Sequence, residues 1–347
     1  MPDYPGNADP GNDFTFLNEA EVAAIFSPSR AIQSQRDAFL ALGRGTAVLP
    51  DKLMVANTRD GSVAFCYAAR LSPEDGAVSK FGSINPANPA RHLPSISAVI
   101  VVLDVDTGRP MAIMDGTIIT TRRTAAASAV AVDALSRVDA KSLAVLGCGV
   151  QGREHVRMLA LVRSFDSVHL WSRDPQSCAA AATLLGAETG LNVIAHRSAE
   201  EAVRGADVVV ASTLSPVPVV EGRWLEPGAT VVSIGSISPD RCEVGADVVR
   251  SAGLVAVDDP DTAAAHAGPI VGALEAGHLK RSDLVGLGDI LVGRHPGRSG
   301  PGELVYYNST GLGIQDAAAA KTVVDAARLE GIGSRLSLAG SNADRPL

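Results

Sequence analysis

Three glycines in the middle of the chain have the spacing of a phosphate-binding turn. They form a Gly-x-Gly-x-x-Gly pattern directly after an apolar run at 143–146, which is typical of a buried strand, and before a predicted helix at 153–162. In this context the first glycine makes a tight turn, the second lets the backbone approach a pyrophosphate, and the third lets the helix pack closely on the strand. The N–H groups and the dipole at the start of the helix then favour phosphate. The pattern predicts a dinucleotide site that includes Gly147, Gly149, Val150, Gln151 and Gly152.

The end of the next predicted strand, 168–171, indicates which dinucleotide binds. An Asp or Glu at this place reads a free ribose 2′-hydroxyl, whereas an Arg nearby accommodates a 2′-phosphate. Ser172 is small and uncharged, Arg173 can clamp a phosphate, and Asp174 precedes Pro175 and is expected to cap the following helix. This arrangement favours NADP(H) and leaves NAD(H) possible, while Arg173 could also be an ordinary surface arginine.

Composition and charge limit the other partners. The chain has 347 residues, 46% of them hydrophobic, and a formal net charge of −8, which argues against nucleic acid or an anionic membrane as the main partner. The four cysteines form no C-x-x-C pair, and the adjacent acids Asp258 and Asp259 are typical of a turn, so we expect no metal. Residues 1–13 are polar and form no signal peptide, and the apolar run at 98–103 is too short to span a bilayer. We therefore expect a cytoplasmic protein that binds a small molecule, with no nucleic-acid or membrane partner.

The order of predicted elements indicates two domains. Helical and short strand-like segments precede a long Ala-rich helix at 117–135, strands and helices alternate from 142 onward, and a second Ala-rich helix at 311–331 is expected to pack back on the first part. We therefore predict an α/β protein in which a Rossmann domain, a doubly wound parallel sheet, is inserted in a discontinuous α+β domain. The predicted boundaries are 1–137 with 309–347 for the α+β domain and 138–308 for the Rossmann domain.

Four blocks of sequence resemble the ornithine cyclodeaminase/mu-crystallin family over roughly residues 17–335. The blocks are Lys80 with 85–88 and 93–95, residues 106–116 with 120–126, the glycine turn with Gln151, and residues 309–316. The resemblance implies a homodimer in which the α+β domain makes the dimer interface and most of the substrate site. Members use NAD(P)(H) on amino acids or their imines.

The resemblance also implies roles for individual residues. Lys80 matches the lysine that contacts the substrate carboxylate and polarises the reacting carbon, and we assign it as catalytic. Arg123 matches a second contact to carboxylate or cofactor, and Lys52 replaces an arginine, which keeps the charge but loses the planar fork. Further cofactor contacts are expected at Ser95, Thr213, Ser236, Ser309 and Thr310.

Several of these residues have simpler explanations. Lys80 could be a charged residue that protects an edge strand from aggregation. Arg122 and Arg123 lie near a helix start, where positive charge is unfavourable, so we expect one of them to be held for an anionic ligand. His92 could donate a proton but is more often incidental in a loop, and Asp115 is expected to cap or anchor the long helix.

One position departs from the cyclodeaminases of the family. They carry an Asp in the loop after the fifth Rossmann strand, and the matching position here is Ile237, which cannot accept a proton. We therefore expect an NAD(P)H-dependent oxidoreductase that reduces a small α-imino acid (a ketimine) to an amino acid. The alternatives are an amino-acid dehydrogenase or condensing dehydrogenase, a cyclodeaminase-type lyase, and a non-catalytic NADPH-dependent ligand-binding protein.

Overall fold

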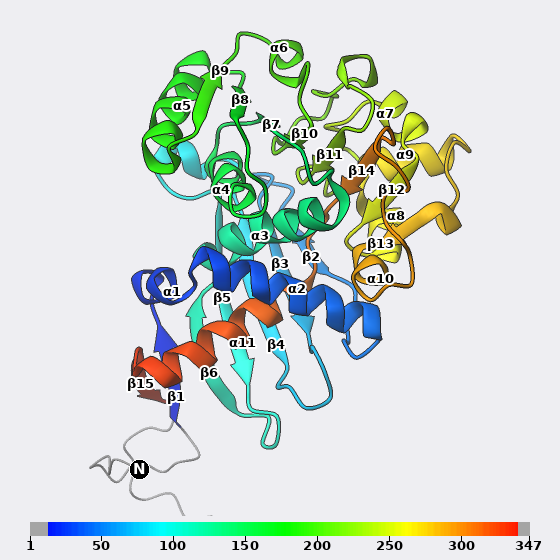
Figure 1. Cartoon of the computed structure of the whole chain (residues 1–347). Coiled ribbons are helices and arrows are strands. Elements are labelled where there is room, and N and C mark those ends of the chain that lie inside the picture. The colour runs from blue at the N-terminus through cyan, green and yellow to red at the C-terminus, as the bar shows by residue number, and fades with distance from the viewer. Residues whose placement is uncertain (1–12, 339–347) are drawn as a thin grey trace, which may run out of the picture.

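A computed structural model describes residues 13–338, in which two β-sheets are joined by a layer of helices (Figure 1). The first sheet has the order β15-β1-β6-β5-β4-β3-β2, and all of its neighbours pair antiparallel except β1 and β6. β5 and β6 form the expected hairpin. Its strands are β1 (Asp13–Leu17), β2 (Leu53–Ala56), β3 (Val63–Ala69), β4 (Val78–Ile84), β5 (Ile96–Leu103), β6 (Pro110–Asp115) and β15 (Ser334–Ser337).

The second sheet is entirely parallel, with the order β13-β12-β14-β11-β10-β7-β8-β9. In the sheet, β7 has β8 and then β9 on one side, and β10 and then β11 on the other. This is the doubly wound arrangement, which binds dinucleotides at the carboxyl ends of its strands. The predicted fold class is therefore confirmed. The strands are β7 (Ser142–Leu146), β8 (Ser167–Trp171), β9 (Asn192–Ala195), β10 (Val208–Ala211), β11 (Thr230–Ser233), β12 (Leu254–Val257), β13 (Leu284–Gly286) and β14 (Val305–Asn308).

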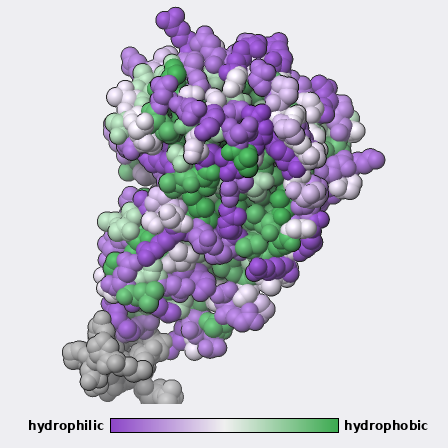
Figure 2. All heavy atoms as spheres, in the orientation of Figure 1, coloured by the Kyte–Doolittle hydropathy of each residue, from purple (hydrophilic) through white to green (hydrophobic). Residues whose placement is uncertain are grey.

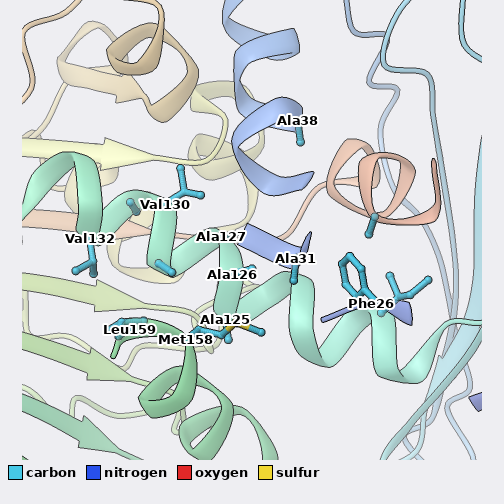
Figure 3. Close-up of a cluster of buried hydrophobic side chains, with 14 of the residues drawn as sticks. Phe26, Ala31, Ala38, Ala125, Ala126, Ala127, Val130, Val132, Met158 and Leu159 are labelled. Carbon is cyan, nitrogen blue, oxygen red and sulfur yellow. The ribbon is translucent and has the colours of Figure 1, made fainter. Parts of the chain in front are cut away.

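Helix α3 (Thr117–Leu135) lies between the two sheets and packs on α2, α4 and α11. Its buried face is mainly alanine, and these short side chains let the neighbouring helices approach closely, as Figure 3 shows for Ala125, Ala126 and Ala127. The helix therefore fixes the position of both sheets. The remaining α-helices are α1 (Glu19–Ile25), α2 (Pro28–Arg44), α4 (Val150–Leu159), α5 (Pro175–Thr189), α6 (Ala199–Val203), α7 (Ala246–Ser251), α8 (Pro260–His266), α9 (Gly268–Glu275), α10 (Leu287–Leu291) and α11 (Gly313–Glu330).

The sequence did not predict several short elements. Strand β14 lies between β11 and β12 in the centre of the parallel sheet, although its four residues follow a stretch rich in Gly and Pro that is typical of a loop. Strand β1 begins at Asp13, within the expected polar tail, and no element was predicted at β15. The rest of that tail, and the end of the second α+β segment at 339–347, lie outside the described residues. Within 13–338, no helix is long and apolar enough to cross a membrane.

Within residues 13–338, no helix packs on one face of the first sheet. Helices α3 and α11 pack on the face that carries Lys80. On the opposite face, Cys66, Phe81 and Val99 form a row across β3, β4 and β5, and Phe81 is 58% exposed.

A separate group of hydrophobic side chains is visible at mid-height in Figure 2, where Figure 1 shows the helices between the sheets.

Candidate active site

The glycine turn has the geometry of a phosphate cradle. Gly147 has a φ of 103°, and a Cβ on it would lie 2.6 Å from the Ser212 carbonyl oxygen. A Cβ on Gly152 would lie 1.8 Å from the Gly147 carbonyl oxygen, whereas a Cβ on Gly149 would meet nothing within 4 Å. The space above Gly149 is thus open at the start of α4, where the free N–H groups point.

The start of α4 offers further groups to a ligand. Val150 is 57% exposed, and the Gln151 side-chain oxygen Oε1 is buried without a hydrogen-bonding partner. The open cradle fits the pyrophosphate end of a dinucleotide, whereas the Gln151 oxygen, an acceptor, can pair only with a donor group. Nearby, Cys148 packs against Cys178, with 3.5 Å between their Sγ atoms.

Three residues follow β8, where a dinucleotide-binding fold places the adenosine ribose. Ser172 is half-buried, and Arg173 is exposed. Asp174 caps α5, because its carboxylate accepts hydrogen bonds from the Gln176 and Ser177 amides at 3.1 and 3.2 Å. Because the carboxylate is engaged with the helix, Arg173 keeps its charge for another partner.

Lys80 lies at the centre of a buried ion-pair group on the first sheet. It is on β4, an interior strand, and only 1% exposed, which excludes the edge-strand explanation. Its Nζ lies 2.8 Å from Asp316 Oδ2 and donates to Thr120 Oγ1 at 3.3 Å. Burial lowers the pKa of Lys80 to about 8, although the Asp316 carboxylate opposes this shift.

Arg123 joins the same group from α3. Its Nε lies 3.3 Å from Asp316 Oδ1, and its Nη1 donates to Gln315 Oε1 at 3.0 Å. Gly311, with a φ of 76°, passes so close that a Cβ on it would lie 3.0 Å from Arg123 Nη1. The neighbouring Arg122 instead donates to the Ala23 and Phe26 carbonyl groups, so Arg123 is the arginine of this pair that faces the site.

Lys52 completes the cationic group and borders a cavity. Its Nζ donates to the Thr310 carbonyl at 2.9 Å, and it lies 5.5 Å from the centre of the Tyr67 ring, which Lys80 approaches to 4.9 Å. Burial lowers the pKa of Lys52 to about 8, while Asp258 opposes that shift. The cavity, of about 480 Å³, is lined by Lys52, Tyr67 and residues of α8, among others.

Asp258 anchors the segment that follows β14. It is fully buried, and its Oδ2 accepts hydrogen bonds from the amides of Thr310 and Gly311 at 2.7 and 2.8 Å. The hydroxyl groups of Ser309 and Thr310 also lie 3.2 to 3.4 Å from this carboxylate. Asp258 is therefore more than the turn residue that the sequence indicated, whereas Asp259 does cap the following helix, α8. Burial raises the pKa of Asp258.

A third buried carboxylate, Glu243, lies between the loops that follow β10 and β11. Its Oε1 accepts hydrogen bonds from the Thr213 amide and hydroxyl, and its Oε2 accepts from Ser233 Oγ at 2.8 Å and the Gly235 amide at 2.6 Å. The hydroxyl of Ser236 is fully buried and accepts from the Glu243 amide, so it faces the protein. Ile237 is half-buried in the next position.

Three other candidates come from the segment 92–115. Ser95 precedes β5, and its carbonyl accepts a hydrogen bond from the Asn85 amide. His92 is exposed in the preceding loop and has a φ of 58°. Asp115 accepts hydrogen bonds from the first amides of α3, Thr117 and Ile118, as a helix anchor does. Among residues 13–338, no group of three or more potential ligands forms a metal site.

The chain matches the model of the ornithine cyclodeaminase/mu-crystallin family over residues 13–331. The chain belongs to this family. It is 30% identical to the ketimine reductase mu-crystallin of Mus musculus, over 81% of this chain and 86% of that protein. The solved structure of a Thermococcus litoralis Δ1-pyrroline-2-carboxylate reductase, in complex with NADH and L-proline, superposes with a TM-score of 0.89 at 28% identity, covering 92% of this chain and 99% of that one. An archaeal alanine dehydrogenase dimer with bound NAD gives a TM-score of 0.88 at 29% identity, covering 94% and 99%.

Sequence reasoning missed the carboxylates of the site. Asp316 was part of a motif but had no assigned role, and Glu243 was not considered. Both lie in the described structure as fully or almost fully buried acids among donors from distant segments. Asp316 could have been found from its place in the first turn of a predicted helix, among apolar residues that are expected to be buried. A buried charge needs a partner, which here predicts a nearby cation.

Proposed function

We propose that this chain is an NAD(P)H-dependent reductase of a small α-imino acid, which it converts to an amino acid. The observation that carries this proposal is the buried group of Lys80, Arg123 and Asp316, which lies beside the segment after β14, at the carboxyl edge of a dinucleotide-binding sheet. The relatives named above, a ketimine reductase, an imino-acid reductase and an amino-acid dehydrogenase, support the predicted class of NAD(P)-dependent oxidoreductase.

The charges of the site suit a substrate with one carboxylate. Lys52, Lys80 and Arg123 are three cations, and Asp258 and Asp316 are two carboxylates, so the group retains one unit of positive charge. Lys80 and Arg123 share Asp316 but keep N–H groups that can donate to a substrate carboxylate. The substrate would be bound between this group and the nicotinamide, so that the prochiral carbon is fixed in orientation.

The dinucleotide supplies the hydride when it is bound, and the residues supply position and charge. The pyrophosphate would lie on the amides after Gly149, and the nicotinamide end would lie beside Thr213, Ser236, Ser309 and Thr310. A protonated imine is already electrophilic, so the site needs no strong base, which agrees with Ile237 in place of an acid. Ser172 and Arg173 support NADP(H) as the preferred form, although the solved relatives named above bind NADH or NAD.

The uncovered face of the first sheet supports a homodimer. The row of Cys66, Phe81 and Val99 exposes apolar side chains across three strands, and all four residues of β2 at the sheet edge are exposed. Contiguous apolar surface of this kind is characteristic of interaction sites. A second copy of this chain would cover it, in keeping with the dimeric archaeal relative. Measurement of the mass in solution by light scattering tests this, and a monomer at all concentrations would contradict it.

The test of the function is the loss of reduced-nicotinamide absorbance with a panel of substrates. Oxo acids are supplied with and without ammonium or methylamine, alongside preformed cyclic ketimines. Oxidation that requires the imine supports a reductase. Activity only with one oxo acid and one particular amine favours a condensing dehydrogenase. Tight NADPH binding with no oxidation across the panel contradicts the proposal and favours a ligand-binding role.

A further inference from the structure

Glu243 is a buried carboxylate without a cationic partner in the part of the chain that the structure describes. It is fully buried, and no described lysine, arginine or histidine forms an ion pair with it. Its partners are neutral: two backbone amides and two hydroxyl groups. The other buried acids of the site differ, because Asp316 contacts two cations and Asp258 has Lys52 nearby.

The hydrogen bonds around Glu243 fit its ionised form. The Thr213 amide donates to Oε1 and the Gly235 amide donates to Oε2, and an amide N–H can only donate. An ionised carboxylate accepts all four hydrogen bonds, two on each oxygen. These four donors would therefore stabilise a negative charge at this buried position.

Glu243 lies between two loops that would border a bound nicotinamide. Thr213 follows β10 and Gly235 follows β11, and these strands belong to the half of the sheet opposite the adenosine half formed by β7, β8 and β9. Dinucleotides bind across the carboxyl ends of such strands, with one nucleotide on each half. Glu243 joins the two loops that would border the nicotinamide, and a Cβ on Gly235 would lie only 1.7 Å from the Thr213 carbonyl oxygen, so these loops are closely packed.

We infer that the Glu243 carboxylate is a positioning residue that holds these loops and electrostatically favours the oxidised nicotinamide over the reduced one. The inference rests on the proposed function only in that the chain binds a nicotinamide dinucleotide. The oxidised ring carries a positive charge and the reduced ring does not, so a nearby buried anion attracts only the oxidised form. The same charge would assist departure of a hydride from the reduced ring, since positive charge develops there.

The test compares the dissociation constants of NADP⁺ and NADPH, measured by isothermal titration calorimetry. In Glu243→Gln, the ratio of the NADP⁺ constant to the NADPH constant should rise about tenfold, because only the oxidised form loses an attraction. Glu243→Asp keeps the charge, and its ratio should stay near that of the wild-type protein even if both forms bind more weakly. Asp247→Asn is the matched control. The Asp247 carboxylate accepts a hydrogen bond from the Gly222 amide, outside the two loops that Glu243 joins, so both dissociation constants should be unchanged.

An unchanged ratio in a folded Glu243→Gln protein would overturn the inference, as would equal weakening of both forms. If the wild-type protein binds neither form, the proposed function fails instead. Should Glu243→Gln not fold, the wild-type ratio is measured as the pH is lowered from about 7 to about 5, where Lys52 and Lys80, with pKa values of about 8, are already mostly protonated. Burial raises the pKa of Glu243, so protonation removes the anion and the ratio should rise. Burial also raises the pKa values of Tyr306 and Cys242, which stay protonated, and that of Asp258, so the same titration of Asp258→Asn separates the contribution of Asp258. A flat ratio would again overturn the inference.

Discussion

The two halves of the site are built by different means. The pyrophosphate end uses backbone: a turn of glycines within six residues of sequence, free amides, and almost no side-chain charge. The proposed substrate end uses side chains: Lys80, Arg123 and Asp316 come from β4, α3 and α11, and the last two are separated by almost two hundred residues. The first half is local in sequence, and the second exists only after the chain has folded.

This difference predicts that changes to each half will affect different measurements. Substitutions in the ion-pair group should lower turnover and leave dinucleotide binding intact. Substitutions in the turn should act on the dinucleotide and on the stability of the parallel sheet.

The largest effect is expected from Lys80→Ala. Removal of this buried cation, which we propose binds the substrate carboxylate, should lower kcat/KM by about 10²- to 10³-fold. The dissociation constant of NADPH should change little, because Lys80 lies on the other sheet. Lys321→Ala, on the surface of α11, is the control and should behave as wild type. Full activity of Lys80→Ala would remove this residue from the site.

The next effect is expected from Gly152→Ala. Its new methyl group would lie 1.8 Å from the Gly147 carbonyl oxygen, so the turn must shift. We expect a loss of about 1–3 kcal/mol in the free energy of unfolding, measured by denaturant titration, together with weaker dinucleotide binding. Gly186→Ala in α5 is the matched control, because its nearest contact would be at 3.7 Å. Equal stability of the two variants would contradict the close packing of the turn.

A smaller effect, confined to one cofactor, is expected from Arg173→Ala. If the guanidinium pairs with a 2′-phosphate, the KM for NADPH should rise about tenfold or more while the KM for NADH stays constant. Arg204→Ala, an exposed arginine paired with Glu200, controls for the loss of surface charge. Equal changes for both cofactors would refute the proposed NADP(H) preference.

The smallest effect near neutral pH is expected from Lys52→Arg. Lys52 has a lowered pKa of about 8, so it is charged below that pH and loses its charge above it. The KM for the imino acid should therefore rise with pH above about 8, and the arginine variant should show a smaller rise, because only Lys80 then loses its charge there. If Lys52→Arg keeps the same pH dependence, the rise belongs to Lys80 or to the substrate.

The sequence predicted the local half of this site better than the distributed half. Gly147 and Gly152 predict the turn, because the positive φ of Gly147 and the close packing at Gly152 favour glycine. Asp174 predicts a helix cap by its place before Pro175. Asp316 and Glu243 gave no comparable signal, since a buried acid is explained by partners that are distant in sequence. Strand β14 was missed for a related reason: four residues suffice in the centre of a parallel sheet, where both neighbours supply the hydrogen bonds. The contacts of Ser95 and the domain boundaries stay predictions.

The most direct test of the central claim follows the hydride. The protein is mixed with a cyclic ketimine and NADPH that carries deuterium at the transferable position of the nicotinamide, and the amino-acid product is analysed by mass spectrometry and NMR. The account predicts one deuterium at the α-carbon of the product and none elsewhere, with transfer slowed about 10²- to 10³-fold in Lys80→Ala. An amino-acid product without deuterium, or bound NADPH that transfers none to any imine, would contradict it.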